Sequence, residues 1–126
     1  MTPNYFTRRQ FIQTTAVAGA AMFAGCATVA PRRLGPNDKL NIGVVGVMGK
    51  GQSDTDFCAG ENIVALCDVD SSRATSQLKK YPNATFYQDW RVMLEKETTL
   101  DAIIIAIPDH LHAVVAATAI RMGKHV

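Results

Sequence analysis

The chain has 126 residues, 48% hydrophobic and 19% charged, which is typical of one globular domain and excludes a disordered or collagen-like chain. Its formal net charge is +2, and without Arg8 and Arg9, which lie in a segment that we expect to be removed, 11 basic residues face 11 acidic ones. This balance provides no attraction for a polyanion, so no nucleic-acid partner is predicted.

Residues 1–30 have the features of an export signal. The stretch TRRQFI at positions 7–12 precedes an apolar run rich in Ala and Gly that extends to Ala30. A basic start, an apolar stretch and small residues are typical of a signal peptide, and paired arginines indicate twin-arginine export. The alternative is a transmembrane anchor, but the run falls short of the ~20 strongly apolar residues that spanning requires. We therefore expect the twin-arginine machinery as a partner and a periplasmic or otherwise extracytoplasmic location.

The end of this leader allows two processing sites. Phe23-Ala24-Gly25-Cys26 resembles the L-A-G-C lipobox of bacterial lipoproteins, in which the cysteine is acylated and becomes the mature N-terminus. Cys26 is thus a candidate lipid anchor, while ordinary cleavage near Ala30 is the alternative. Residues 31–38 contain two prolines and a glycine, which predicts a short linker. The folded domain is expected over residues 39–126.

Within that domain, apolar strands alternate with helices. Strands are expected over Leu40–Val45, Ile63–Cys67, Ala84–Tyr87 and Leu100–Ile107. Helices are expected over about Gly51–Ala59 and Ser71–Lys80, then through Lys96 with Asp89 as the cap, and from Asp109 or His110 to Met122 with Gly123 at the C′ position. Lys124-His125-Val126 is expected to begin a fifth strand. This alternation gives parallel strands joined by right-handed crossovers, so we predict an α/β fold with a Rossmann-type doubly wound parallel sheet. Ligands of such sheets bind beyond the carboxyl ends of the strands.

A glycine-rich stretch, GVVGVMGKG at positions 43–51, follows the first predicted strand. Gly46 and Gly51 match the first and third positions of the dinucleotide fingerprint G-x-G-x-x-G, whereas Met48 occupies the second. That second glycine lets the backbone approach the pyrophosphate, so Met48 must turn its side chain away from the phosphates or lie over the cofactor. Gly49 can restore part of the missing freedom. The pattern alone leaves open a damaged fingerprint, a working variant or a plain tight turn.

An acidic residue at the end of the second strand gives independent support. Asp68 follows Gly46 by 22 residues, close to the ~20 expected for a carboxylate that binds the adenosine ribose. It would accept hydrogen bonds from both ribose hydroxyls and repel a 2′-phosphate. Neither Val69 nor Asp70 offers a cation, so NAD is favoured over NADP. The alternative is that Asp68 only caps the helix that begins at Ser71.

Four segments together resemble one enzyme family. KLNIGVVGVMGKG, IVALCDVD, FYQDWRVMLEK and DAIIIAIPDHLHAVVAATAIRMGKHV resemble the N-terminal domain of the Gfo/Idh/MocA oxidoreductases, which include glucose–fructose oxidoreductase and inositol 2-dehydrogenase. The resemblance covers Leu40–Val126 and departs from the usual pattern at Met48. It implies an oxidoreductase that uses NAD on the CH–OH group of a sugar or polyol. The cofactor-binding residues expected from motif and resemblance are Gly46, Val47, Met48, Gly49, Lys50, Gly51, Asp68, Ile107, Pro108 and His112.

The resemblance also implies parts that the 126 residues do not include. Family members continue into an E-K-P-like segment, whose lysine assists proton transfer, and into a second domain that supplies the substrate pocket and often the oligomer interface. We therefore expect a fragment holding most of a cofactor domain, with a homo-oligomer only at full length, and name no catalytic residue. Two alternatives remain: a redox-assisted glycosidase that uses bound NAD, and a non-catalytic NAD-binding module.

The remaining candidate ligands do not form a metal site in the sequence. His110 and His112 form a short H-x-H without a third ligand nearby, and zinc sites normally need three or four. His125 is expected to be structural. Cys58 and Cys67 are read as small buried apolar residues, although a disulfide between them is not excluded by the sequence.

Overall fold

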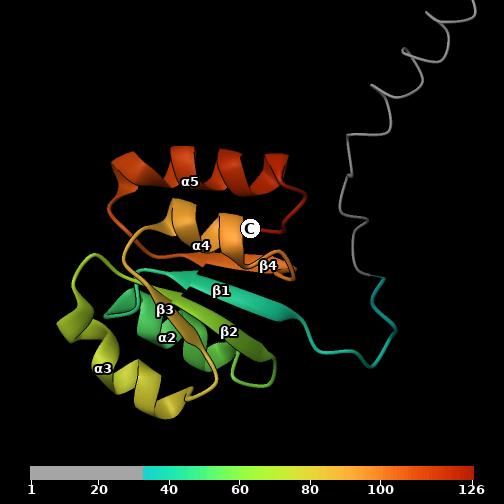
Figure 1. The fold of residues 1–126 in the computed structure, drawn as a ribbon, viewed down its shortest axis with the longest axis horizontal. Helices are drawn as coiled ribbons and strands as arrows, with labels where there is room; N and C mark the ends of the chain where they lie inside the picture. Colours follow the sequence, from blue (N-terminus) through green and yellow to red (C-terminus); the bar gives the residue numbers. More distant parts are fainter. Residues whose placement is uncertain (1–32) are drawn as a thin grey trace, which may run out of the picture. The chain divides into compact units, whose positions relative to one another are not determined.

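The computed structural model describes residues 33–126, so the predicted export signal, including Arg8-Arg9 and Cys26, lies outside the described residues. Four parallel strands form one sheet in the order β3-β2-β1-β4 (Figure 1). The strands are β1 Asn41–Val45, β2 Asn62–Cys67, β3 Thr85–Tyr87 and β4 Ala102–Ile105. This strand order, with β1 between β2 and β4, matches the first four positions of the Rossmann order 3-2-1-4-5-6, and it confirms the predicted fold class.

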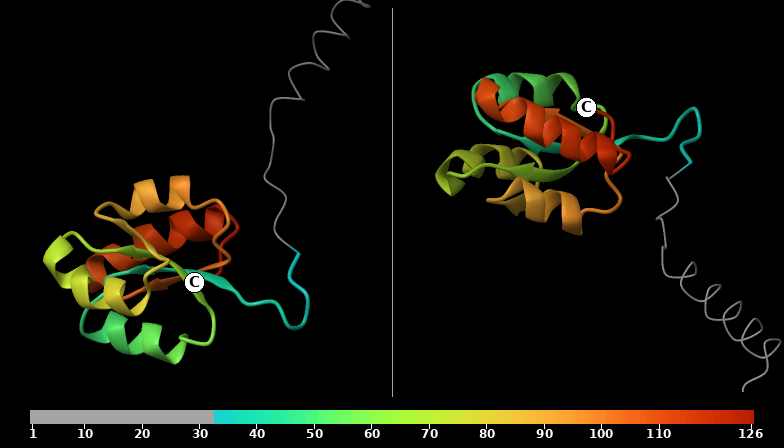
Figure 2. Two further views of the ribbon diagram at one scale, coloured as in Figure 1. Left: turned by 60° about the horizontal axis from the view of Figure 1, so that its bottom comes forward. Right: turned by 90° about the horizontal axis from the view of Figure 1, so that it is seen from above.

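Two helices cover each face of the sheet. Their bounds are α2 Lys50–Phe57, α3 Ser71–Lys80, α4 Trp90–Lys96 and α5 Asp109–Arg121. Figure 1 shows α4 and α5 on one side of the sheet and α2 and α3 on the other, and Figure 2 turns the same arrangement. The chain changes face after β3: α3, which follows β2, lies on one face of the sheet, and α4, which follows β3, lies on the other. Right-handed crossovers produce it, because the chain moves outward from β1 to β3 and then returns to place β4 on the other side of β1.

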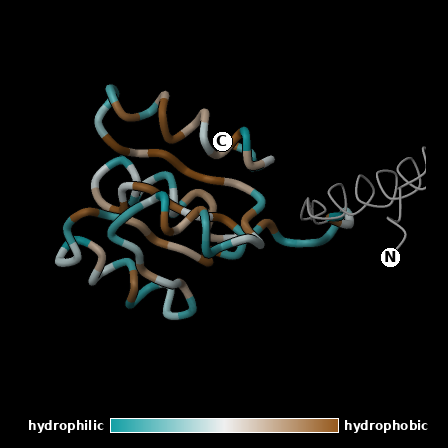
Figure 3. The backbone as a smooth tube through the Cα atoms, turned by 45° about the horizontal axis from the view of Figure 1, so that its top comes forward, coloured by the Kyte–Doolittle hydropathy of each residue, from teal (hydrophilic) through white to brown (hydrophobic). Residues whose placement is uncertain are grey.

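The core consists of two apolar layers, one on each face. Along β1, Ile42 and Val44 face the α2–α3 layer, whereas Val45 faces the α4–α5 layer. The α2–α3 layer also contains Leu66 and Ala74. Figure 3 shows the apolar colour concentrated along the strands. Strands that are apolar on both faces are typical of buried parallel sheets, and this explains their near-continuous runs of Val, Ile and Leu.

Short capping interactions set the helix limits. The Asp70 side chain accepts a hydrogen bond from Ser72 N and the Asp89 side chain accepts one from Arg91 N, so both residues are N-caps. Gly123 has φ 76° directly after the last helical turn of α5, which confirms the glycine expected at the C′ position. None of the helices in residues 33–126 is long and apolar enough to span a membrane.

Several expected bounds differ from the structure by one or two residues, and other expectations differ in further ways. The fourth strand is shorter than Leu100–Ile107, because a turn closed by the bond from Leu100 N to Glu97 O precedes it and because its partner β1 ends at Val45. The helix expected from Gly51 begins one residue earlier, at Lys50. His125 is exposed, although its backbone forms the expected parallel bridge with Ala102, which places the start of a fifth strand beside β4.

Candidate functional site

The carboxyl ends of three strands bring three loops together. Residues 46–49 follow β1, residues 68–70 follow β2 and residues 106–108 follow β4. Backbone hydrogen bonds join them: Gly46 N donates to Cys67 O at 2.8 Å and Ala106 N donates to Val45 O at 2.8 Å. The predicted ligand edge is therefore one continuous region around the end of the central strand.

Gly46 occupies a position that only glycine fits. Its φ is +88°, and an added Cβ would lie 2.2 Å from the Ala106 carbonyl oxygen and 3.1 Å from Cγ2 of Ile107. The left-handed backbone turns the chain sharply out of β1, and the missing side chain lets the loop after β4 approach. Gly46 thus performs the tight-turn task expected of the first fingerprint glycine.

Gly51 performs the third glycine's task. It is buried in the first turn of α2, and an added Cβ would lie 1.8 Å from the Gly46 carbonyl oxygen. The Thr55 hydroxyl, one turn further along α2, donates to Gly51 O at 2.6 Å. The helix can therefore pack directly on the turn, as the fingerprint requires.

The conformational freedom that Met48 lacks is found at Gly49. Gly49 has φ 61° and ψ −115° and is the N-cap of α2, a backbone region that is essentially restricted to glycine. No heavy atom lies within 4 Å of the place where its Cβ would be. The turn therefore has glycines at 46, 49 and 51, and its second positive φ lies at Gly49 instead of at Met48.

Val47 and Met48, which lie between Gly46 and Gly49, face in different directions. Val47 is 1% exposed and belongs to the α2–α3 core layer, whereas Met48 is 38% exposed. Ser76 Oγ, on α3, donates to Met48 Sδ at 3.8 Å. The Met48 side chain is thus directed toward α3, which leaves the backbone of the glycine turn uncovered by it.

The start of α2 offers a suitable environment for an anion. Helix N-termini present unsatisfied N–H groups and a partial positive charge, and no acidic residue lies in the first turn of α2. Lys50 is the first residue of α2, and its Nζ is paired with Asp54 Oδ1 at 2.5 Å along the exposed helix surface. With a glycine-lined turn ahead of it, this end of α2 fits a pyrophosphate.

Asp68 connects the first two loops. Its Oδ2 accepts from Val47 N at 3.2 Å and its Oδ1 accepts from Asp70 N at 3.0 Å. The alternative that Asp68 only caps α3 is wrong, because the cap is Asp70, whose carboxylate accepts from Ser72 N at 2.9 Å. Hydrogen bonds from Ser72 Oγ and N lower the pKa of Asp70. Asp68 is thus the carboxylate bonded to the glycine turn, while Asp70 caps α3.

In the loop after β4, a histidine side chain is bonded to the backbone. Pro108 is the N-cap of α5, and His112 Nε2 donates to the Ile107 carbonyl oxygen at 2.6 Å. This bond fixes the protonated nitrogen, so Nδ1 is the atom that remains for a further partner. His112 also lines an open groove of about 480 Å³ along β4, together with Ile103–Ile105 and Ala116.

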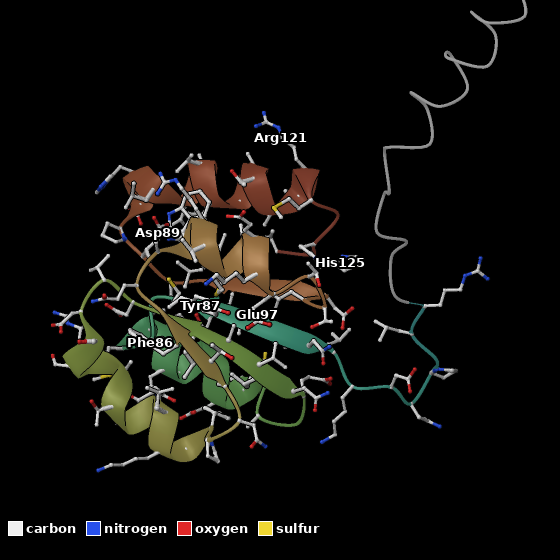
Figure 4. All side chains as sticks on the ribbon, in the orientation of Figure 1. Phe86, Tyr87, Asp89, Glu97, Arg121 and His125 are labelled. Atoms are coloured by element: carbon white, nitrogen blue, oxygen red, sulfur yellow. The ribbon has the colours of Figure 1, made fainter. Side chains whose placement is uncertain are left out.

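Other candidate residues do not join this region. Asp89 follows β3 and so marks the edge of the sheet where the strands end. His125 lies at the opposite end of the sheet from Asp89, as Figure 4 shows. No group of three potential ligands among the His, Cys, Asp and Glu residues of the described part could hold a metal. Cys58 and Cys67 are both free thiols. Burial, together with the charges of Asp89 and Asp68, raises the pKa of Cys67 to about 12, so this thiol stays protonated and unreactive.

Two residues of the region were not predicted from the sequence. Asp70 had a usable signal, since a D-S-S-R stretch before a helix is an N-cap pattern. Ser76 had none, because its contact with Met48 joins residues 28 positions apart. The structure brings together the glycine turn, Asp68 and the residues Ile107 and Pro108, while His112 lies on the groove beside them.

Known proteins share this arrangement. Residues 40–126 match the Gfo/Idh/MocA family, described as an oxidoreductase family with an NAD-binding Rossmann fold. A glycosyl hydrolase family 109 protein of Solibacter usitatus is 34% identical over 104 residues, which cover 72% of this chain and 24% of that protein. Inositol 2-dehydrogenase 1 of Saccharopolyspora erythraea is 31% identical over 91 residues, or 69% of this chain and 27% of the relative.

A solved structure agrees with these matches. The NAD binding oxidoreductase from Klebsiella pneumoniae superposes with a TM-score of 0.57 at 33% identity, covering 70% of this chain and 26% of that one. The chain thus spans about a quarter of the length of these proteins. The strand order, the glycine turn and the match over residues 40–126 lead to one conclusion: the chain belongs to the Gfo/Idh/MocA oxidoreductase family and carries its NAD-binding Rossmann fold.

Proposed function

We propose that residues 39–126 bind NAD for an oxidoreductase that acts on the CH–OH group of a sugar or polyol. The observation that carries the proposal is the hydrogen bond between Val47 N and Asp68 Oδ2 beside the glycine turn. This bond supports the proposal because it holds the carboxylate that we assign to the ribose beside the turn that we assign to the pyrophosphate, and a dinucleotide would contact both. When bound, the nicotinamide supplies the hydride acceptor or donor.

The chain's own residues would divide the binding between them. The turn from Gly46 to Gly51 and the N-terminus of α2 would hold the pyrophosphate, with Lys50 adding charge. Asp68 would accept hydrogen bonds from the ribose. Ile107, Pro108 and His112 would border the nicotinamide end, since they follow β4 on the other side of β1.

NAD is proposed over NADP for an electrostatic reason. A 2′-phosphate bound at the ribose would approach both Asp68 and Asp70, and the hydrogen bonds from Ser72 keep Asp70 ionised. The negative phosphate and the negative carboxylates would repel each other. The test is calorimetric titration of the chain with NAD, NADP and their reduced forms. Equal affinity for NAD and NADP would contradict the role given to Asp68, and no binding of either would contradict the proposed function.

A second candidate activity belongs to the same cofactor class. The 34% identity to a glycosyl hydrolase family 109 protein favours a glycosidase that oxidises and then re-reduces a sugar with retained NAD. The full-length protein distinguishes the two. A dehydrogenase forms NADH in proportion to oxidised sugar, whereas a redox-neutral glycosidase releases an aglycone without net NADH.

Export and anchoring are further parts of the proposal. Arg8-Arg9 supports twin-arginine export and Cys26 supports a lipid anchor in the periplasm. An exported enzyme would have to acquire NAD in the cytoplasm and keep it, which requires a dissociation constant well below ~1 μM. Purification from the periplasm without added cofactor, followed by denaturation and assay of released nicotinamide, tests this. Protein that remains cytoplasmic would contradict the export proposal.

A further inference from the structure

Met48 stands at the position where the fingerprint has its second glycine, yet the structure gives it a defined place. Its neighbour Val47 is buried and donates its N–H to Asp68. Met48 is therefore one residue away from the residue bonded to the carboxylate proposed to bind the ribose. On its other side, Gly49 carries the left-handed conformation of the turn. The backbone geometry of the turn thus does not depend on a glycine at 48.

The side chain bridges two elements of the site. Met48 Sδ accepts a hydrogen bond from Ser76 Oγ on α3 at 3.8 Å, while 38% of the residue stays exposed. Methionine suits such a position because its thioether is polarisable and its three rotatable bonds adapt to an adjoining surface. An apolar, partly exposed side chain between the glycine turn and α3 can cover one flank of a ligand that lies across Asp68.

From this geometry we propose that Met48 is a positioning residue that forms a side wall for the ADP half of the cofactor. The inference rests on the proposed binding of NAD and adds an interaction at the one position where the fingerprint is broken. The nicotinamide half would lie toward the loop after β4 and would not touch Met48. An interaction confined to one half of the ligand makes the inference testable with fragments of NAD.

Chemical footprinting of methionine provides the measurement. Hydrogen peroxide transfers one oxygen atom to an accessible thioether sulfur and leaves as water, which gives the sulfoxide. Three methionines of the described part give internal references: Met48 is 38% exposed, Met122 is 45% exposed at the far end of α5, and Met93 is fully buried. Mass spectrometry of proteolytic peptides reports the oxidation rate of each one separately.

The full chain is oxidised alone, with ADP and with nicotinamide mononucleotide, after calorimetry has measured the dissociation constant of each ligand. At an ADP concentration ten times its dissociation constant, about 9% of the protein is free, so oxidation of Met48 should slow by up to about tenfold. Met122 should oxidise at an unchanged rate. Nicotinamide mononucleotide should leave both rates unchanged. Bound ADP that fails to slow Met48 would overturn the inference while leaving the proposed function intact.

Substitutions provide a second readout that a purely structural role would not produce. Met48→Leu keeps most of the wall and should retain the affinity for ADP. Met48→Gly removes it and should weaken ADP binding by about fourfold for each methylene group that no longer packs on the ligand, with no change for nicotinamide mononucleotide. Unchanged or tighter binding of ADP by Met48→Gly would overturn the inference. Absence of ADP and NAD binding to the native chain would overturn the proposed function together with it.

Discussion

The loop after β1 and the loop after β4 border the same region but are built in different ways. The first is fixed by backbone geometry: Gly46 has no room for a side chain, Gly51 touches the Gly46 carbonyl group, and Val47 is bonded to Asp68. The second is joined to β1 by one backbone bond, from Ala106 N to Val45 O, and its later part is held by a side-chain bond from His112 to Ile107 beside an open groove. The half proposed to recognise the cofactor is thus built into the core, whereas the half near the proposed chemistry depends on side chains that can change.

The largest expected effect comes from a side chain added at the packed turn. Gly51→Ala would put a Cβ 1.8 Å from the Gly46 carbonyl oxygen, so α2 could not pack on β1. The free energy of unfolding should fall by at least about 4 kcal/mol, the range of severe core disruption. Denaturant unfolding followed by circular dichroism measures this.

Gly49→Ala is the matched control. Gly49 has a positive φ, but no neighbouring side chain or loop lies within 4 Å of the Cβ that alanine would add. The substitution should therefore lower the free energy of unfolding only by the backbone penalty of about 1–3 kcal/mol. Equal decreases in stability for the two variants would show that close packing is not what distinguishes the turn after β1.

The next effect concerns ligand affinity. Asp68→Ala removes the acceptor proposed for the ribose and should weaken NAD binding by ~1–3 kcal/mol, the scale of a hydrogen bond to a charged group. The preference for NAD over NADP should decrease in the same variant. Calorimetric titration with both cofactors measures the two changes. Asp101→Ala is a control, because Asp101 accepts from Asn41 N at the amino end of β1, away from the proposed site.

A smaller effect is expected on the other side of the site. His112→Ala removes the 2.6 Å bond to Ile107, but that carbonyl group lies in an accessible loop where water can replace the donor. Stability should fall by about 1 kcal/mol, and NAD should bind nearly as before. A decrease in NAD affinity as large as that of Asp68→Ala would show that the two halves of the site are not independent.

The smallest effect depends on pH. The hydrogen bonds from Ser72 lower the pKa of Asp70 in the folded chain, so ionised Asp70 stabilises the fold. This contribution is complete above about pH 4, the usual carboxyl range, and disappears as the pH falls through the lowered pKa. The difference in melting temperature between native chain and Asp70→Ala should therefore be present at neutral pH and vanish in acid. A difference that persists in strong acid would exclude the ionised cap as its cause.

The sequence predicted most of the fold because its signals are local. Ser71–Lys80 is helical over the expected residues, and the N-cap Asp89 and the C′ glycine Gly123 have the expected roles. Spacing predicted Gly46, Gly51 and Asp68 as site residues, and the structure places all three at the carboxyl ends of β1 and β2. The direction of the Met48 side chain could not be found in this way, because it depends on Ser76, 28 residues away. The bond between Val47 and Asp68 likewise depends on how two strands align, which no local pattern specifies.

The placement of Gly46 has a consequence for the order of events during folding. Its amide is bonded to the residue that ends β2, and its missing side chain admits the loop after β4, so segments up to 60 residues apart must align before the turn takes its final shape. We expect such non-local contacts to form late, because closing long loops has an entropic cost that must be met first. A dinucleotide would therefore encounter a competent site only on a nearly complete sheet. Cofactor capture would then follow folding, and its rate would report how quickly β4 reaches β1.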